Sequence, residues 1–283
     1  KSVKNTAQIT RAMQLVAAAK MKKAQDQALA GREYAAHLTQ VLGDIRSNLS
    51  DEGNALLAQG KQGAPELVLV ISTDKGLCGP LNTNLAKMIR AQVPADAHFV
   101  TVGRKLRVLC EKLGRKVIAD FSVKDPVPFS QTRAVARLLT QQFLAGHYSK
   151  VSIVYTRFVN TLRQEPTLKL LLPVHDPVRG EPNAEGGFTV EEKIKDAFRD
   201  YTFEPSAAAV LDAILPLYIN YEVYQAHVEA RASEHSARMV AMKAATDNAK
   251  KFIKELTLEY NKLRQGAITA ELLEITTAMK AME

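Results

Sequence analysis

The sequence predicts an α/β protein in which an antiparallel coiled coil of the N- and C-terminal helices carries an inserted domain with an open α/β sheet. Three observations support this prediction. Residues 217–283 contain no proline and a single glycine, Gly266. Apolar residues near both ends of the chain recur with the alternating four- and three-residue spacing of a coiled-coil seam. Between the two ends, strand-sized apolar runs alternate with helical patterns, as in an open and largely parallel sheet.

The N-terminal helix is expected within residues 1–52 and should stop at the polar, glycine-containing stretch 50–53. Small residues dominate the first part of its apolar seam, so a partner helix can approach closely there, whereas the leucines that follow need a wider contact. The seam consists of Ala17, Met21, Ala24, Ala28, Gly31, Ala35, Leu38, Leu42, Ile45 and Leu49.

The inserted domain is expected at residues 66–205. The predicted strands are 66–72, 98–102, 116–121 and 150–156, with one more inside 158–174, and the predicted helices are 84–92, 105–113 and 131–144. Two prolines and three glycines mark residues 176–187 as an exposed loop.

The C-terminal helix is expected at residues 206–283, with Ser206 as its N-cap and a kink at Pro216. Residues 217–283 alone would span roughly 100 Å, whereas a compact globule of this chain length is about 50 Å across. The helix must therefore protrude. Its predicted seam is Val228, Ala232, His235, Met239, Met242, Thr246, Ala249, Ile253, Leu256, Tyr260, Leu263, Ala267 and Ala270.

An antiparallel pair with Leu49 opposite Leu217 would leave residues 266–283 without a partner helix. Arg264, Gln265 and Thr269 stand where the helix leaves its partner. Exposed apolar residues on an unpaired helix promote aggregation in water, so another molecule should surround them. The apolar stripe of this end is Ile268, Leu272, Ile275, Met279 and Met282.

Charge is unevenly placed along the chain. The net charge is +8, and residues 1–25 contribute six basic side chains and no acid. A basic, acid-free start suits a targeting segment, a nucleic-acid arm or a surface that meets an acidic protein. The unbroken seam weakens the first interpretation, and the lack of aromatic residues before Tyr34 weakens the second. Because the sequence opens on Lys1, we also expect the natural start to lie upstream.

The sequence does not predict catalysis, a metal centre or a membrane span. The turn 72–81 lacks both the GxxxxGK[ST] and the GxGxxG patterns, so a structural or partner-contacting turn is favoured over a phosphate site. The six histidines show no HxxxH or HExxH spacing. The two cysteines, Cys78 and Cys110, form no CxxC pair, which favours a reducing compartment. The apolar runs are only strand-sized.

Three long motifs resemble one family, the gamma subunit of the F-type ATP synthase, in its bacterial form. They are ITRAMQLVAAAKMKKAQ at 9–25, STDKGLCGPLN at 72–82, and RMVAMKAATDNAKKFIKEL with YNKLRQGAITAELLEI at 238–256 and 260–275. The resemblance implies a Rossmann-like inserted domain and a rotating central shaft without catalytic residues or cofactors of its own. This shaft couples proton flow to the conformational cycle of the catalytic subunits.

The resemblance also implies partners and a location. The rod would fill a ring of catalytic beta and non-catalytic alpha subunits, and the sheet domain would sit with the epsilon subunit on the membrane proteolipid ring. No nucleic acid and no direct lipid insertion are expected, and the protein would be peripheral on the cytoplasmic face of a bacterial plasma membrane.

Individual positions are assigned by the same resemblance. Met13, Arg264, Gln265 and Thr269 match family positions that contact the catalytic subunits, and the basic face adds Lys20, Lys22 and Lys23. Phe203 and Glu204 match an aromatic and acidic pair near the membrane ring. The apolar stripe from Ile268 to Met282 would be the bearing inside the ring.

The sequence is also compatible with two alternative functions. One is a free-standing coiled-coil adaptor whose α/β domain senses a small molecule. The other is a phosphate-binding enzyme, which would require nucleotide binding by the isolated chain. Identification of the co-purifying subunits separates these classes.

Overall fold

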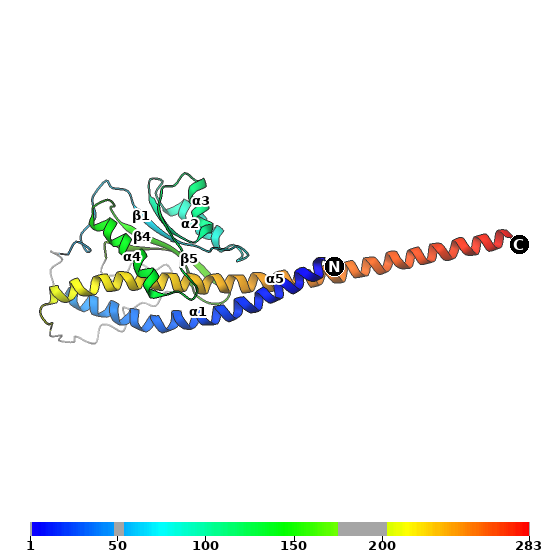
Figure 1. The fold of residues 1–283 in the computed structure, drawn as a ribbon, viewed down its shortest axis with the longest axis horizontal. Coiled ribbons are helices and arrows are strands. Elements are labelled where there is room, and N and C mark those ends of the chain that lie inside the picture. Colours follow the sequence, from blue (N-terminus) through cyan, green and yellow to red (C-terminus); the bar gives the residue numbers. More distant parts are fainter. Residues whose placement is uncertain (1, 48–53, 175–202, 283) are drawn as a thin grey trace.

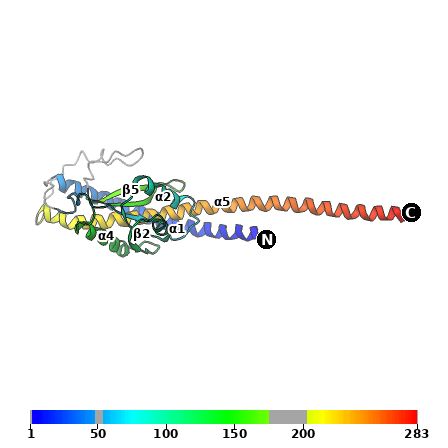
Figure 2. The same cartoon turned by 90° about the horizontal axis from the view of Figure 1, so that it is seen from above.

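The computed structural model describes residues 2–47, 54–174 and 203–282. Two long helices form a rod, α1 (Ser2–Ser47) and α5 (Ala207–Met282), and a sheet domain packs against one end of it (Figure 1). Seen from above, α1 and α5 lie side by side, and the N-terminal end of α1 lies far short of the C-terminal end of α5 (Figure 2). The predicted coiled coil with an inserted α/β domain is thus confirmed.

The inserted domain is a five-stranded sheet with the strand order β3-β2-β1-β4-β5. All neighbouring strands are parallel except β5, which runs antiparallel to β4. The elements are β1 (Leu67–Ile71), α2 (Leu81–Gln92), β2 (His98–Val102), α3 (Arg104–Lys112), β3 (Val117–Phe121), α4 (Phe129–Leu144), β4 (Val151–Phe158) and β5 (Gln164–Leu172). The prediction of a largely parallel sheet is confirmed.

The sheet is covered on both faces, as parallel sheets require. Val68 and Val70 of β1 point to the face covered by α2 and α3. Leu67, Leu69 and Ile71 point to the opposite face, where they share one core with α4 and the rod. Alternation along a single strand therefore splits the interior into two layers, and one of them includes the rod itself.

The beginning of α5 follows the predicted cap. The backbone N–H of Ala209 donates a hydrogen bond to Ser206 Oγ (3.2 Å), which satisfies one of the free donors of the first turn. The helix continues through Pro216. Pro216 is exposed, whereas Leu215 and Ile219 beside it are fully buried, so packing of the inner face offsets the hydrogen bond that proline cannot donate.

The register of the rod differs from the predicted one. Thr10 Oγ1 and Thr246 Oγ1 form a buried hydrogen bond of 2.7 Å, and the Tyr221 hydroxyl donates to the Gly31 carbonyl oxygen. Ser2 therefore lies opposite about residue 254, not opposite residue 265 or so. The prediction was wrong because it started the pairing after Pro216, whereas α5 starts at Ala207. Every described side chain from Lys254 to Ala281 is exposed, so the unpaired end is longer than predicted.

The seam prediction was right in part. Ala17, Ala24, Ala28, Leu42 and Ile45 of α1 are buried, as expected. On α5 the predicted seam is covered only as far as Ile253, and its members Leu256, Tyr260 and Leu263 are exposed.

The middle of α5 is also more than a seam. Residues 226–237 are buried on nearly all sides, because α1 covers one side and the sheet covers another. The interpretation of α5 as a helix with a single partner helix was therefore wrong for this stretch.

Candidate functional site

The basic N-terminal part of α1 is largely open to solvent. The side chains of Lys4, Arg11, Lys22 and Lys23 are exposed, and Met13 is half-buried against the rod. Of the predicted contact residues on α1, only Lys20 is paired within the described chain: its Nζ lies 2.8 Å from Asp125 Oδ2. The structure thus leaves Lys22 and Lys23 free to meet an acidic surface, while Lys20 already has an acidic neighbour.

The predicted contact residues of α5 stand on bare helix. Arg264, Gln265 and Thr269 are exposed, and the Thr269 hydroxyl donates to the Gln265 carbonyl oxygen one turn earlier (2.9 Å). Met13 is opposite about residue 243, because Thr10 is opposite Thr246. The structure therefore does not bring Met13 together with Arg264 and Gln265, which lie about six turns further along α5.

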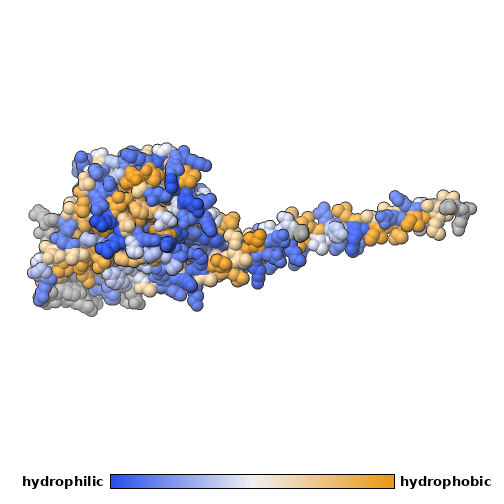
Figure 3. All heavy atoms as spheres, viewed as in Figure 1, coloured by the Kyte–Doolittle hydropathy of each residue, from blue (hydrophilic) through white to orange (hydrophobic). Residues whose placement is uncertain are grey.

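The predicted apolar stripe is exposed. Ile268 is 49% exposed, Leu272 and Ile275 are each 57% exposed, and Met279 is 66% exposed. The side chain of Met282 lies outside the described residues. Figure 3 shows apolar side chains along the whole protruding part of α5, interleaved with hydrophilic ones. This end of the molecule has the surface of an interface rather than that of a solvated helix.

The two residues predicted to lie near the membrane ring, Phe203 and Glu204, stand at the foot of the rod, the end opposite the bare end of α5. Phe203 is half-buried and packs against the core beneath the sheet, and Glu204 beside it is exposed. Both residues directly precede α5. Glu204 is thus available to a partner, while Phe203 contributes to the core.

The turn that follows β1 is a structural contact with the rod. The Asn82 amide donates to Thr73 Oγ1 (2.8 Å), and the Arg238 guanidinium of α5 donates to the Gly76 carbonyl oxygen (3.4 Å). Leu77 is 61% exposed at a φ of 61°, a backbone conformation that is unusual for a side chain of this size. The turn therefore presents an apolar side chain outward, as a partner-contacting turn would.

A groove of about 650 Å³ runs between α1, this turn and α5. Met13 and Val16 of α1 line one side, and Leu77 lines another. Charged side chains surround the groove, among them Arg238 and Glu234, whose Nη2 and Oε1 lie 2.8 Å apart. The predicted contact residue Met13 and the exposed Leu77 thus share one surface.

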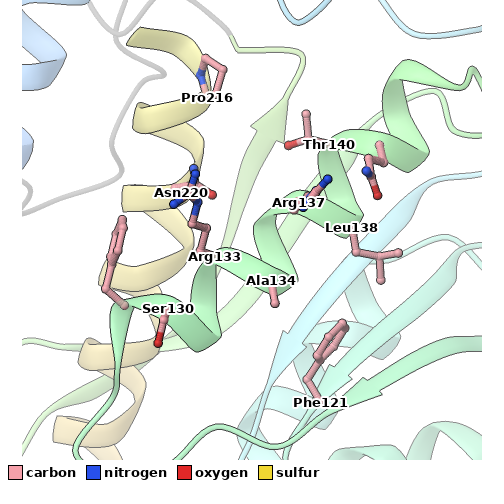
Figure 4. A pocket seen from close by; sticks show the side chains of 11 residues that line it. Phe121, Ser130, Arg133, Ala134, Arg137, Leu138, Thr140, Pro216 and Asn220 are labelled. Atoms are coloured by element: carbon pink, nitrogen blue, oxygen red, sulfur yellow. The ribbon is translucent and has the colours of Figure 1, made fainter. Parts of the chain in front are cut away.

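A second groove, of about 1090 Å³, lies between α4 and α5 (Figure 4). Phe121, Leu138 and Pro216 give it apolar walls, and Arg133 and Arg137 of α4 add positive charge. Neither arginine forms an ion pair with a described residue. Sequence reasoning missed this groove, because its walls come from segments that are far apart in the chain.

Sequence reasoning also missed a set of buried polar groups on α5. His227 is buried, and its Nδ1 lies 2.7 Å from the Val223 carbonyl oxygen, while its Nε2 has no hydrogen-bond partner among the described residues. Burial lowers the pKa of His227 from 6.5 to about 4. No periodicity could reveal this, because the apolar seam lies on another side of the helix.

Within the described ranges, histidine, cysteine, aspartate and glutamate side chains form no group of three that could hold a metal ion. None of the described helices is long and apolar enough to cross a bilayer.

Comparison with known proteins agrees with the motifs. The ATP synthase family model matches residues 1–282. The ATP synthase gamma chain of Akkermansia muciniphila is 50% identical, over 100% of this chain and 96% of that relative. The ATP synthase gamma chain of Opitutus terrae is 44% identical, over 99% of this chain and 95% of that relative. This chain belongs to the ATP synthase gamma chain family.

Solved structures share the fold of this chain. A chain of the central stalk and c-ring structure of the Tetrahymena thermophila mitochondrial ATP synthase superposes with a TM-score of 0.63 at 24% identity, over 84% of this chain and 99% of that chain. A chain of the rotor structure of the Euglena gracilis mitochondrial ATP synthase gives a TM-score of 0.65 at 18% identity, over 94% and 95% of the two chains. The fold of this chain therefore recurs in these two structures at low sequence identity.

Proposed function

We propose that this chain is the central shaft of a proton-translocating ATP synthase, which turns inside a ring of alpha and beta subunits and carries no catalytic group itself. The observation that carries this proposal is the bare end of α5, where every described side chain from Lys254 to Ala281 is exposed. A single unpaired helix is only marginally stable in water, and an exposed apolar stripe along it promotes aggregation. It needs an enclosing partner, and a ring of subunits is a partner of suitable shape.

The residues of the bare end divide into two roles. The apolar stripe Ile268, Leu272, Ile275, Met279 and Met282 serves as a bearing, because apolar contact is non-directional and can slide. Arg264, Gln265 and Thr269 make polar contacts that change with the rotational state of the catalytic subunits, since hydrogen bonds are directional.

The basic face of α1 meets acidic parts of the catalytic subunits through Lys22 and Lys23, with Lys20 in part committed to Asp125. Met13 joins this contact from the groove that it shares with Leu77. Replacement of Met13 by lysine should disturb the contact, either by excess attraction or by leaving a charge in a dry site. We expect Met13→Lys to lower the number of protons pumped per ATP.

The foot of the rod sits on the membrane proteolipid ring beside an epsilon subunit, with Phe203 and Glu204 close to that contact. Both residues lie where α5 begins, at the end opposite the bearing. The complex is peripheral on the cytoplasmic face of a bacterial plasma membrane, which agrees with the bacterial origin of the relatives.

Purification of the tagged full chain from membranes tests this function. We expect alpha, beta and epsilon subunits and the proteolipid ring to co-purify at fixed stoichiometry, as subunit identification by mass spectrometry would show. A chain recovered only as monomer or homodimer would refute the shaft and favour a free-standing adaptor. Nucleotide binding by the isolated chain would instead favour an enzyme.

A further inference from the structure

The loop between β3 and α4, residues 122–128, touches both helices of the rod. Toward α1, Asp125 Oδ2 lies 2.8 Å from Lys20 Nζ, and the Gln27 amide donates to the Val127 carbonyl oxygen (3.0 Å). The two α1 residues are seven positions apart, so the loop follows one face of α1 for two turns.

The same loop is tied to α5. His235 Nε2 lies 3.1 Å from Asp125 Oδ2, the oxygen that also faces Lys20. The Arg231 guanidinium donates to the Val123 carbonyl oxygen at 2.8 Å. One carboxylate oxygen thus joins a side chain of α1, a side chain of α5 and the sheet domain.

The two helices differ in how they are otherwise attached to the sheet domain. α5 lies in the core beneath the sheet, where Leu215, Ile219 and Val223 are fully buried. Near this loop, α1 reaches the sheet domain at Lys20 and Gln27 and, between them, at Ala24, which packs with Phe158 of β4. Toward its N-terminus α1 pairs with α5, as in the bond between Thr10 and Thr246. A force on the sheet domain therefore enters α5 through the core and reaches α1 through the α1–α5 seam, while this short stretch adds a direct polar path from the sheet domain to the N-terminal part of α1.

We propose that residues 122–128 are a strap that transmits torque from the sheet domain to both helices of the rod at once, with Asp125 as its positioning residue. This inference rests on the proposed role of the chain as a shaft. With the strap in place, the basic face of α1 turns in step with α5. Without Asp125, the part of α1 before Lys20 is held mainly by its seam with α5, so the rotation of its basic face follows that of the sheet domain less closely.

The decisive variant is Asp125→Asn, which keeps the shape of the side chain and removes its charge. Lys20→Met breaks the same bond from the other side, but Lys20 is also a proposed contact of the catalytic subunits, so Asp125 gives the cleaner test. Lys124→Met is the matched control, because Lys124 is exposed in the same loop and its side chain is in no ion pair with a described residue.

The first measurement uses the isolated full-length chain. We expect Asp125→Asn to speed the hydrogen exchange of α1 amides 2–19 about fivefold, the change typical of a lost, partly exposed ion pair. The amides of α2 and α3, on the far face of the sheet, should be unchanged, as should all amides of Lys124→Met. Unchanged exchange in α1 would overturn the strap, and this measurement does not depend on the chain being a rotor.

The second measurement uses the assembled complex. We expect Asp125→Asn to pump fewer protons per ATP at an unchanged ATPase rate per complex, and Lys124→Met to keep the wild-type number of protons per ATP. Faster hydrogen exchange of the α1 amides together with a normal number of protons pumped per ATP would overturn the torque role. Failure of the wild-type chain to assemble with catalytic subunits would instead refute the shaft itself, so the two failures are distinguishable.

Discussion

α5 has two parts that differ in what covers them: a first half, residues 207–253, which packs against α1 and the sheet domain, and a bare second half, residues 254–281. In the first half, Leu215 and Ile219 are fully buried, and polar side chains such as Ser233 and Glu234 are buried with them. In the second half, Leu272 and Ile275 repeat the apolar spacing but stay more than half exposed. One continuous helix thus joins a part that this chain stabilises itself to a part that only a partner can bury. Stability measurements on the isolated chain report on the first half, and assembly reports on the second.

The largest contrast is expected between matched leucines in the two halves. Leu215→Ala removes a fully buried side chain and should lower the free energy of unfolding by about 2–5 kcal/mol. Leu272→Ala, at an exposed position, should change it by less than about 0.5 kcal/mol. Urea unfolding of both isolated variants measures the difference. Equal destabilisation would mean that the second half is buried within the isolated chain, against this account.

The buried half should respond to acid. The pKa of His227 is about 4 in the folded chain and 6.5 as its ordinary value, so between these pH values the unfolded chain binds a proton that the folded chain does not. The free energy of unfolding should therefore fall as the pH drops from about 6.5 to about 4, by roughly 3 kcal/mol from this residue.

Urea unfolding across this pH range tests the role of His227. The variant His227→Gln should show a flatter dependence on pH than the wild type, while other titrating groups contribute equally to both. Parallel curves for the two proteins would contradict a buried, neutral His227.

The seam between α1 and α5 should resist added volume. Ala28 is buried, and the amide of Gln225 on α5 approaches its carbonyl oxygen at 3.4 Å. Ala28→Leu should therefore cost about 1–3 kcal/mol through overpacking and impair assembly. The exposed neighbour Leu29 is a control site, where replacement by alanine should change little. A normal melting temperature in Ala28→Leu would argue against the close-packed seam.

The smallest effect is expected on the bare half itself. Gly266 stands on the unpaired helix, and a methyl group added there would meet no atom within 4 Å. Gly266→Ala should thus stabilise the helix locally by about 1 kcal/mol and slow hydrogen exchange around it. Exchange in α2 should stay the same. Faster exchange at 260–272 in the variant would show that this stretch is not a free helix.

Sequence patterns predicted the elements well, because apolar spacing fixes which side of a helix or strand is buried. They failed where tertiary packing overrides a local signal. Pro216 suggested a late start of the helix pairing, but the buried faces of Leu215 and Ile219 carry the helix through it. The burial of His227 and Ser233 could not be predicted, since polar residues on a helix normally indicate its solvated face.

The candidate site was predictable only in part. Lys22, Lys23, Arg264, Gln265 and the apolar stripe lie exposed, as a contact surface requires, but their contacts remain proposals. Lys20 was assigned to a partner without a sign of its bond to Asp125. That bond joins residues 105 positions apart in the sequence, and no spacing rule reaches so far.

The central claim is that the bare half of α5 is a bearing inside the ring. Two variants with several substitutions each test it most directly. One replaces the five residues of the apolar stripe by alanine, which keeps helix propensity. The other replaces Arg264 and Gln265 by alanine. The measurement is the yield of assembled complex against the ATPase rate per assembled complex.

If the stripe is a bearing, the first variant lowers the yield and leaves the rate of the surviving complexes nearly normal, because non-directional apolar contact favours assembly without setting the steps of rotation. The second variant leaves the yield intact and slows turnover. A five-alanine variant that assembles fully and yet stops turnover would contradict the bearing.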